Sequence, residues 1–169
     1  MSEKIINRVA NSQLITLELK TFSSKQEMAE VDIKEWLYKE QIIKEKEFRL
    51  NINKHDWSVY TNKNVAINCS VDSIIPNWAY MLISIALKPY AKFSYVGSTK
   101  QLEEYLFNSN IQALETSNFT NKKVLIKGCS ESHIPTSAYV SITNKLLPVV
   151  QSLMFGEACS NVPLFKKPR

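Results

Sequence analysis

Three cysteines, each followed directly by a serine, are the residues whose type and spacing could do chemistry. They are Cys69, Cys129 and Cys159, and each lies a few residues before a proline. Three thiolates that converge on one point with an open position suit an iron–sulfur cluster or a zinc ion. A fourth ligand could come from His133, four residues after Cys129, from His55 or from an external group. The pattern therefore predicts a metal or cluster site formed by Cys69, Cys129 and Cys159, with His133 as a further ligand.

Two other interpretations of the cysteines stay open. The chain has no Cys-x-x-Cys pair, so a shared site would depend wholly on tertiary structure. Cys129 and His133 are close enough in sequence to form a thiolate–imidazolium pair, which would favour thiol chemistry. Free cysteines are also among the most buried residues and often only fill space in a core.

An internal repeat positions two of these cysteines. The first copy covers residues 61–90 and the second residues 120–149; both run from Thr-Asn-Lys through an apolar triplet and Cys-Ser to Ile-Pro-x-x-Ala-Tyr. The apolar triplets predict buried strands, and a proline suits the start of a helix. Each cysteine then lies in a loop from a strand end to a helix start, where open α/β sheets build their sites.

The rest of the chain supports an α/β fold. Alternating or apolar residues predict strands from Leu14 and over residues 93–96, and helices over residues 32–38, 45–52 and 100–108. The helix over residues 79–87 is apolar nearly all round, which predicts burial on every side. At 169 residues we expect a single domain with one mixed sheet, in which Cys69 and Cys129 emerge at the same edge.

Aromatic and histidine residues outside the cysteine loops have simple structural interpretations. Tyr80 and Tyr139 follow the helix-starting prolines and are expected to anchor helix to sheet, or else to reach the cysteine loops with their hydroxyls. The segment His55-Asp56-Trp57 is typical of a helix end or turn. Three tryptophans are expected in the core or in a dimer contact: Trp36, Trp57 and Trp78.

Composition excludes several classes of function. The net charge is +5, but acidic and basic residues are interleaved, which is typical of solvated helix faces and not of a nucleic-acid-binding stripe. The one cluster of a single sign is the tail Lys166-Lys167-Pro168-Arg169. The chain has only three glycines and no phosphate-binding loop, and its most apolar segment is too short to span a bilayer. With no secretory signal and an odd number of cysteines, a cytoplasmic location is expected.

Several segments together resemble domain-of-unknown-function family 2480 of Bacteroidota, over nearly the whole chain. They include Asp32-Ile33-Lys34-Glu35-Trp36-Leu37, His55-Asp56-Trp57, Pro76-Asn77-Trp78-Ala79-Tyr80-Met81 and the tail motif Phe155-Gly156-Glu157-Ala158-Cys159-Ser160-Asn161-Val162-Pro163. The resemblance implies a cytoplasmic bacterial protein without an established activity. It also implies iron–sulfur assembly proteins as partners, because members often lie beside genes for sulfur mobilisation. Ala158 departs from the proline that the family tends to have before the tail cysteine.

Two functions follow from these observations. The leading hypothesis is an accessory to iron–sulfur cluster or metal metabolism with Cys69, Cys129 and Cys159 as ligands. The alternative is a non-catalytic binding or scaffold protein, a homodimer, whose cysteines only pack. No membrane association is expected in either case.

Overall fold

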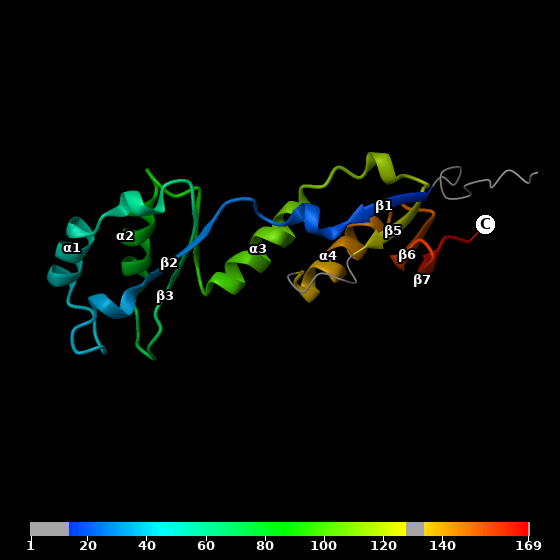
Figure 1. The fold of residues 1–169 in the computed structure, drawn as a ribbon. Coiled ribbons are helices and arrows are strands. Elements are labelled where there is room, and N and C mark those ends of the chain that lie inside the picture. Colours follow the sequence, from blue (N-terminus) through cyan, green and yellow to red (C-terminus); the bar gives the residue numbers. More distant parts are fainter. Residues whose placement is uncertain (1–13, 128–133, 169) are drawn as a thin grey trace, which may run out of the picture. The chain divides into compact units, whose positions relative to one another are not determined.

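The computed structural model describes residues 14–127 and 134–168, and these fold into two compact units (Figure 1). The inserted unit is residues 24–105, and the terminal unit is formed by the segments on either side of it, up to residue 23 and from residue 106. The helix α3 (Thr99–Gln112) contributes residues to both units. Each unit has its own sheet and its own hydrophobic core.

The inserted unit is a three-stranded parallel sheet with two helices packed against it. The strands lie in the order β2-β3-β4, with bounds β2 (Met28–Asp32), β3 (Asn64–Asn68) and β4 (Phe93–Val96). The helices are α1 (Glu45–Lys54) and α2 (Asn77–Leu87). Short 3₁₀ helices follow β2 and precede β3: η2 (Ile33–Trp36) and η3 (Trp57–Tyr60). The core forms because Phe48 of α1 and Ile83 of α2 pack with Val65 of the sheet.

The terminal unit is a four-stranded sheet in the order β1-β5-β6-β7. Its first three strands are parallel, and β7 pairs with β6 in the antiparallel direction. The elements are β1 (Leu14–Glu18), η1 (Leu19–Phe22), η4 (Ser117–Phe119), β5 (Lys123–Lys127), α4 (Thr136–Leu146), β6 (Ser152–Glu157) and β7 (Ser160–Lys166). Ile142 of α4 and Val124 of β5 lie in its core.

The apolar helix α2 is buried on one face only, which corrects the expectation of burial all round. Ala79, Ile83 and Leu87 are inaccessible to solvent and lie on one side at helical spacing. Met81 and Ile85, on the opposite side, are exposed to 64% and 67%. The helix therefore uses one stripe to cover its sheet, as surface helices do.

The two units share the same backbone plan. In each unit the first strand is followed directly by a four-residue 3₁₀ helix and pairs with the second strand. The second strand leads through a loop and a helix to a third parallel strand. The registers correspond: Leu14 pairs with Lys123 as Met28 pairs with Asn64. β1 and η1 thus correspond to β2 and η2, which lie 14 positions later in the sequence. β3, α2 and β4 correspond to β5, α4 and β6, which lie 59 positions later. Descent of the two units from a duplication stays a prediction.

These features confirm the α/β class and correct the expected sheet. The strands that precede Cys69 and Cys129 are β3 and β5, and they belong to separate sheets. The strands that lead to the two cysteines therefore do not share one sheet, contrary to the expectation from the sequence. The helix expected over residues 32–38 is the 3₁₀ helix η2, while the other predicted strands and helices are present near their expected bounds. The single-domain assignment stays a prediction.

Candidate functional site

Asp32, the last residue of β2, joins two loops at the carboxyl edge of the inserted sheet. Its Oδ1 accepts a hydrogen bond from the backbone amide of Lys34 at 2.9 Å, which caps η2, and one from the amide of Ser70 at 3.0 Å. Burial is the largest single influence on the pKa of Asp32 and would raise it. The hydrogen bonds from the Ser70 hydroxyl and from the two amides together outweigh it and lower the pKa. Asp32 is therefore held as a charged carboxylate next to the Cys69-Ser70 loop.

Four aromatic rings gather where α1 ends and η3 begins: Trp36, His55, Trp57 and Tyr60. His55 follows α1 directly, and its Nε2 lies 3.2 Å from the hydroxyl of Tyr60. The centroid of the His55 ring lies 5.4 Å from that of Trp36 in an edge-to-face arrangement. Tyr60 is only 8% exposed, and Trp57 fixes the turn because its Nε1 donates to the carbonyl of Ile52 at 2.8 Å. Local helix termination thus brings a histidine and a buried tyrosine hydroxyl together.

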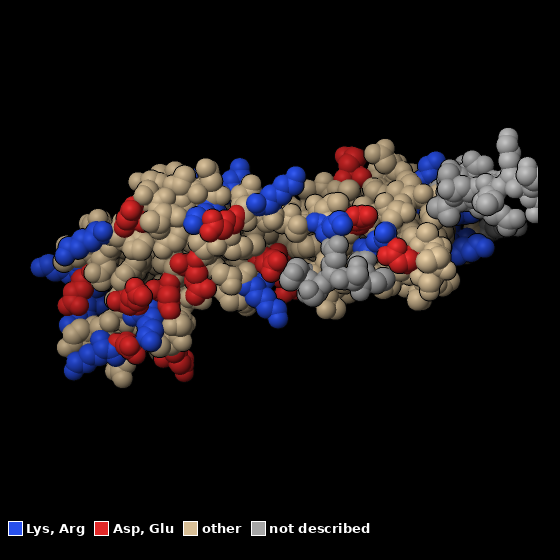
Figure 2. Space-filling view, viewed as in Figure 1, with Lys and Arg blue, Asp and Glu red and all other residues tan. Residues whose placement is uncertain are grey.

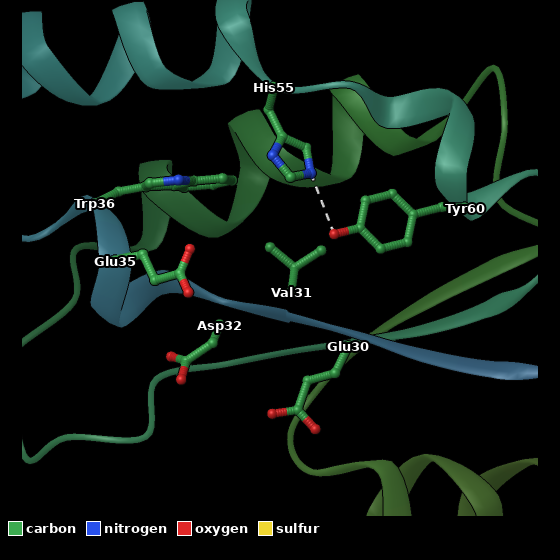
Figure 3. A pocket seen from close by; sticks show the side chains of 7 residues that line it. All are labelled: Glu30, Val31, Asp32, Glu35, Trp36, His55 and Tyr60. Atoms are coloured by element: carbon green, nitrogen blue, oxygen red, sulfur yellow. Dashed lines mark hydrogen bonds between the residues drawn. The ribbon is translucent and has the colours of Figure 1, made fainter.

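Three of these rings and the end of β2 enclose a pocket of about 350 Å³. We call it the β2 pocket; its lining consists of Glu30, Val31, Asp32, Glu35, Trp36, His55 and Tyr60. In the view of Figure 3 the rings of Trp36, His55 and Tyr60 lie on one side of β2, and the carboxylates of Glu30 and Asp32 lie on the other. The carboxylate of Glu35 lies on the side of the rings, next to Trp36. All seven residues belong to the inserted unit. Its volume lies within the range of small-ligand sites, near the lower end.

Acidic side chains outnumber basic ones in the lining of the β2 pocket. Glu35 forms no hydrogen bond or ion pair with the residues that the structure describes, whereas Glu30 accepts a hydrogen bond from Nδ2 of Asn68 at 2.9 Å. Burial, and after it the charge of Glu35, raises the pKa of Tyr60 above its ordinary value. No lysine or arginine is part of the lining. The pocket therefore combines an uncompensated carboxylate with a neutral phenol and aromatic surface.

This arrangement favours binding of a cation. Aromatic faces attract ammonium and guanidinium groups, and carboxylates pair with both. The lining contains no serine, threonine, cysteine or lysine that could act as a nucleophile beside His55. Tyr60 stays protonated at neutral pH, which suits a hydrogen-bond donor or acceptor and not a base.

The cysteines that the sequence singled out are distributed over both units. Cys69 follows β3, is partly buried, and packs against the core of the inserted unit. It lies near Tyr80, whose pKa is raised by burial and then by the charge of the Cys69 thiolate. Cys159 is exposed in the turn between β6 and β7. Cys129 and His133 lie outside the described residues.

Within residues 14–127 and 134–168, no group of three or more His, Cys, Asp or Glu side chains could hold a metal ion. Cys69 and Cys159 therefore have no ready set of ligands among the described residues. The site that combines them with Cys129 and His133 stays a prediction.

The β2 pocket is not among the sites expected from the sequence. His55 was expected at a helix end or turn, or as a fourth ligand to the cysteines, and Trp36 in the core or a dimer contact. No role was expected for Glu30 or Glu35. A signal was present in the correspondence between the units, which extends beyond the repeat that the sequence displays. Where the inserted unit has Glu30, Glu35, Trp36 and Tyr60, the terminal unit has Thr16, Thr21, Phe22 and Phe119. Carboxylates and a phenol thus occur in one unit where the other has hydroxyls and plain phenyl rings.

Comparison with known proteins identifies one matching family. A search of curated proteins and a search of solved structures each found no similar protein. No helix in the described part of the chain is long and apolar enough to cross a membrane. A model of the family described as "Protein of unknown function (DUF2480)" matches residues 3–167. Because this match covers nearly the whole sequence, the chain belongs to the DUF2480 family.

Proposed function

We propose that the inserted unit is a non-catalytic binding module that holds a positively charged organic group in the β2 pocket. The observation that carries the proposal is the carboxylate of Glu35, without a partner among the described residues, beside the aromatic rings of a cavity of about 350 Å³. Among open α/β sheets, the carboxyl edge of the strands is the usual place for a ligand, and Asp32 lies at that edge. The proposal thus gives a specific site to the non-catalytic binding function that the sequence left open.

The expected ligand is an ammonium or guanidinium group. A cation over an aromatic face contributes about 0.5–2 kcal/mol, depending on desolvation. Glu35 adds a charge-assisted hydrogen bond, because its carboxylate is free of partners among the described residues. The contribution of Glu30 is smaller, because its carboxylate already accepts a hydrogen bond from Asn68.

A calorimetric titration tests the proposal. N-acetyl-arginine amide serves as the probe, and its neutral isostere N-acetyl-citrulline amide as the control ligand. We expect the arginine compound to bind and to change the fluorescence of Trp36, with an affinity that falls as salt is raised. Glu35→Gln should weaken binding by about tenfold, which corresponds to about 1.4 kcal/mol.

The matched control variant is Glu103→Gln. Glu103 is an exposed glutamate of the same unit that does not line the pocket. Its substitution should leave binding unchanged. Equal affinity for the arginine and citrulline compounds, or wild-type affinity in Glu35→Gln, would contradict the proposal.

Our second proposal is that Cys69, Cys129 and Cys159 bind an iron–sulfur cluster or a metal ion. In this proposal the protein acts in the cytoplasm with iron–sulfur assembly proteins as partners. What favours it is that Cys69 and Cys159 are both free thiols, so neither is consumed by a disulfide. The backbone of the Cys69 loop is also tied to Asp32 through Ser70. Anaerobic reconstitution with iron and sulfide tests it: a charge-transfer band should form in the wild type and be lost in Cys129→Ser. Identical spectra in both proteins would exclude the cluster.

A further inference from the structure

A second groove of the inserted unit lies between α2 and β4. It encloses about 210 Å³ and shares no lining residue with the β2 pocket. We call it the β4 groove; it is lined by Ser84, Leu87, Lys88 and Ala91 from α2 and the turn after it, and by residues 92–94. The hydroxyls of Ser84 and Ser94 lie 3.4 Å apart and join the helix to the strand. This volume is below the usual range of small-ligand sites, so the groove suits side chains of a longer partner.

The β4 groove runs along a strand that has a free edge. β4 is the last strand in the order β2-β3-β4, and on its second side it pairs with no strand of the described residues. The amide of Gly97, directly after β4, donates to the carbonyl of Ile67 in β3 at 2.9 Å. Backbone groups point alternately to the two sides of a strand, so the amides and carbonyls of Ser94 and Val96 face the free edge. Unpaired groups of this kind form a template for another extended chain.

The lining of the β4 groove is basic. Lys88 and Lys92 belong to it, and it contains no acidic residue. Both lysines are exposed, and neither forms an ion pair with the described residues. No aspartate or glutamate occurs in the sequence between Asp72 and Glu103. Over the surface that Figure 2 shows, by contrast, lysines and arginines are mixed with acidic residues. The groove therefore has two positive charges that the described residues do not compensate.

We propose that the β4 groove binds an extended acidic segment of a partner protein, which adds to the inserted sheet as a strand beside β4. The backbone of the segment pairs with Ser94 and Val96, and its carboxylates lie against Lys88 and Lys92. Every second side chain of a strand points to the same face, so an alternating acidic sequence directs its carboxylates toward α2. The inference is independent of the β2 pocket, because it uses other residues of the unit.

The two lysines select against a second copy of this chain as the occupant. Two copies joined edge to edge through β4 would bring the lysines of one copy against those of the other, and like charges across a strand pair are destabilising. Lysines on exposed edge strands are a common means of preventing such pairing. An acidic strand removes the repulsion and forms ion pairs in its place.

Fluorescence anisotropy with a labelled peptide tests the inference. The probe is the peptide Glu-Val-Glu-Val-Glu with fluorescein at its amino end and an amide at its carboxyl end, and the control peptide has glutamine in place of each glutamate. We expect the acidic peptide to bind the full chain with an affinity that falls as salt is raised, and the control peptide to bind about tenfold more weakly.

Two groove variants and a matched control locate the binding. Lys88→Gln and Lys92→Gln should each weaken binding of the acidic peptide about two- to fivefold, which is the range for an exposed ion pair. Lys54→Gln changes an exposed lysine of the same unit that does not line the groove, and it should leave binding unchanged.

Amide hydrogen exchange measured by NMR separates strand addition from attraction of charge alone. In the free protein the amides of Ser94 and Val96 should exchange faster than that of Tyr95, which faces β3. Saturating acidic peptide should slow exchange at Ser94 and Val96 about tenfold or more, because both amides become paired. Failure of the acidic peptide to bind, equal affinity for the two peptides, wild-type affinity in both groove variants, or unchanged exchange at Ser94 and Val96 in the complex would overturn the inference.

Discussion

Ile83 and Ile85 lie two residues apart on α2 and have opposite environments, which allows a matched test of the core. Ile83 is fully buried and packs in the core of the inserted unit, whereas Ile85 is 67% exposed. Substitution of Ile83 by alanine removes three carbon atoms, each worth about 0.8 kcal/mol of burial. The cavity left behind adds to this loss, so we expect Ile83→Ala to lower the free energy of unfolding by about 3–4 kcal/mol.

Ile85→Ala should change the free energy of unfolding by less than about 0.5 kcal/mol, because little buried surface is lost and alanine favours the helix. Denaturant unfolding followed by tryptophan fluorescence measures both values for the inserted unit alone. All three tryptophans, Trp36, Trp57 and Trp78, belong to that unit. Similar losses for the two variants would mean that α2 is covered on both faces and would refute the packing described above.

Three further predictions concern single residues. The pKa of Asp32 is lower in the folded state than its ordinary value of 3.8. Its carboxylate therefore stabilises the fold at pH values above 3.8, and this stabilisation is lost as the pH falls through the folded-state pKa. Asp32→Asn should therefore be less stable than the wild type at pH 7, and the difference should shrink at pH 2–3 in urea unfolding; an equal difference at both pH values would contradict this. Gly97→Ala should cost about 1–3 kcal/mol, because Gly97 has φ +143° and a Cβ there would lie 2.8 Å from Oε1 of Gln101; a neutral substitution in thermal unfolding would argue against this strain. Cys159 is exposed and should react with a thiol reagent faster than the half-buried Cys69. Mass spectrometry of the labelled peptides measures both rates, and faster labelling of Cys69 would contradict the prediction.

The sequence by itself determined the local units of this protein. The apolar triplets Val65–Ile67 and Val124–Ile126 became buried strands, and α2 and α4 begin directly after Pro76 and Pro135. These features depend on neighbouring residues only: apolar periodicity selects strand or helix, and proline presets the backbone at a helix start. The residues of the repeat could therefore be placed on strands, loops and helices without the fold.

Only the tertiary structure decided which strands pair with one another and where a pocket forms. The hydrophobic pattern of β3 resembles that of β5, so the sequence near each strand does not indicate that they pair with different strands. Their separation into two sheets is seen only in the folded chain. The β2 pocket joins residues 30–36 to residues 55–60, and Asp32 reaches the amide of Ser70 across 38 positions. Such contacts join residues that are far apart in the sequence. A hydropathy pattern indicates which residues are buried, but it does not indicate which distant residues they contact. An aromatic residue that lines a pocket and one that fills a core give the same pattern, and Trp36 is therefore recognised as a pocket wall only in the folded chain.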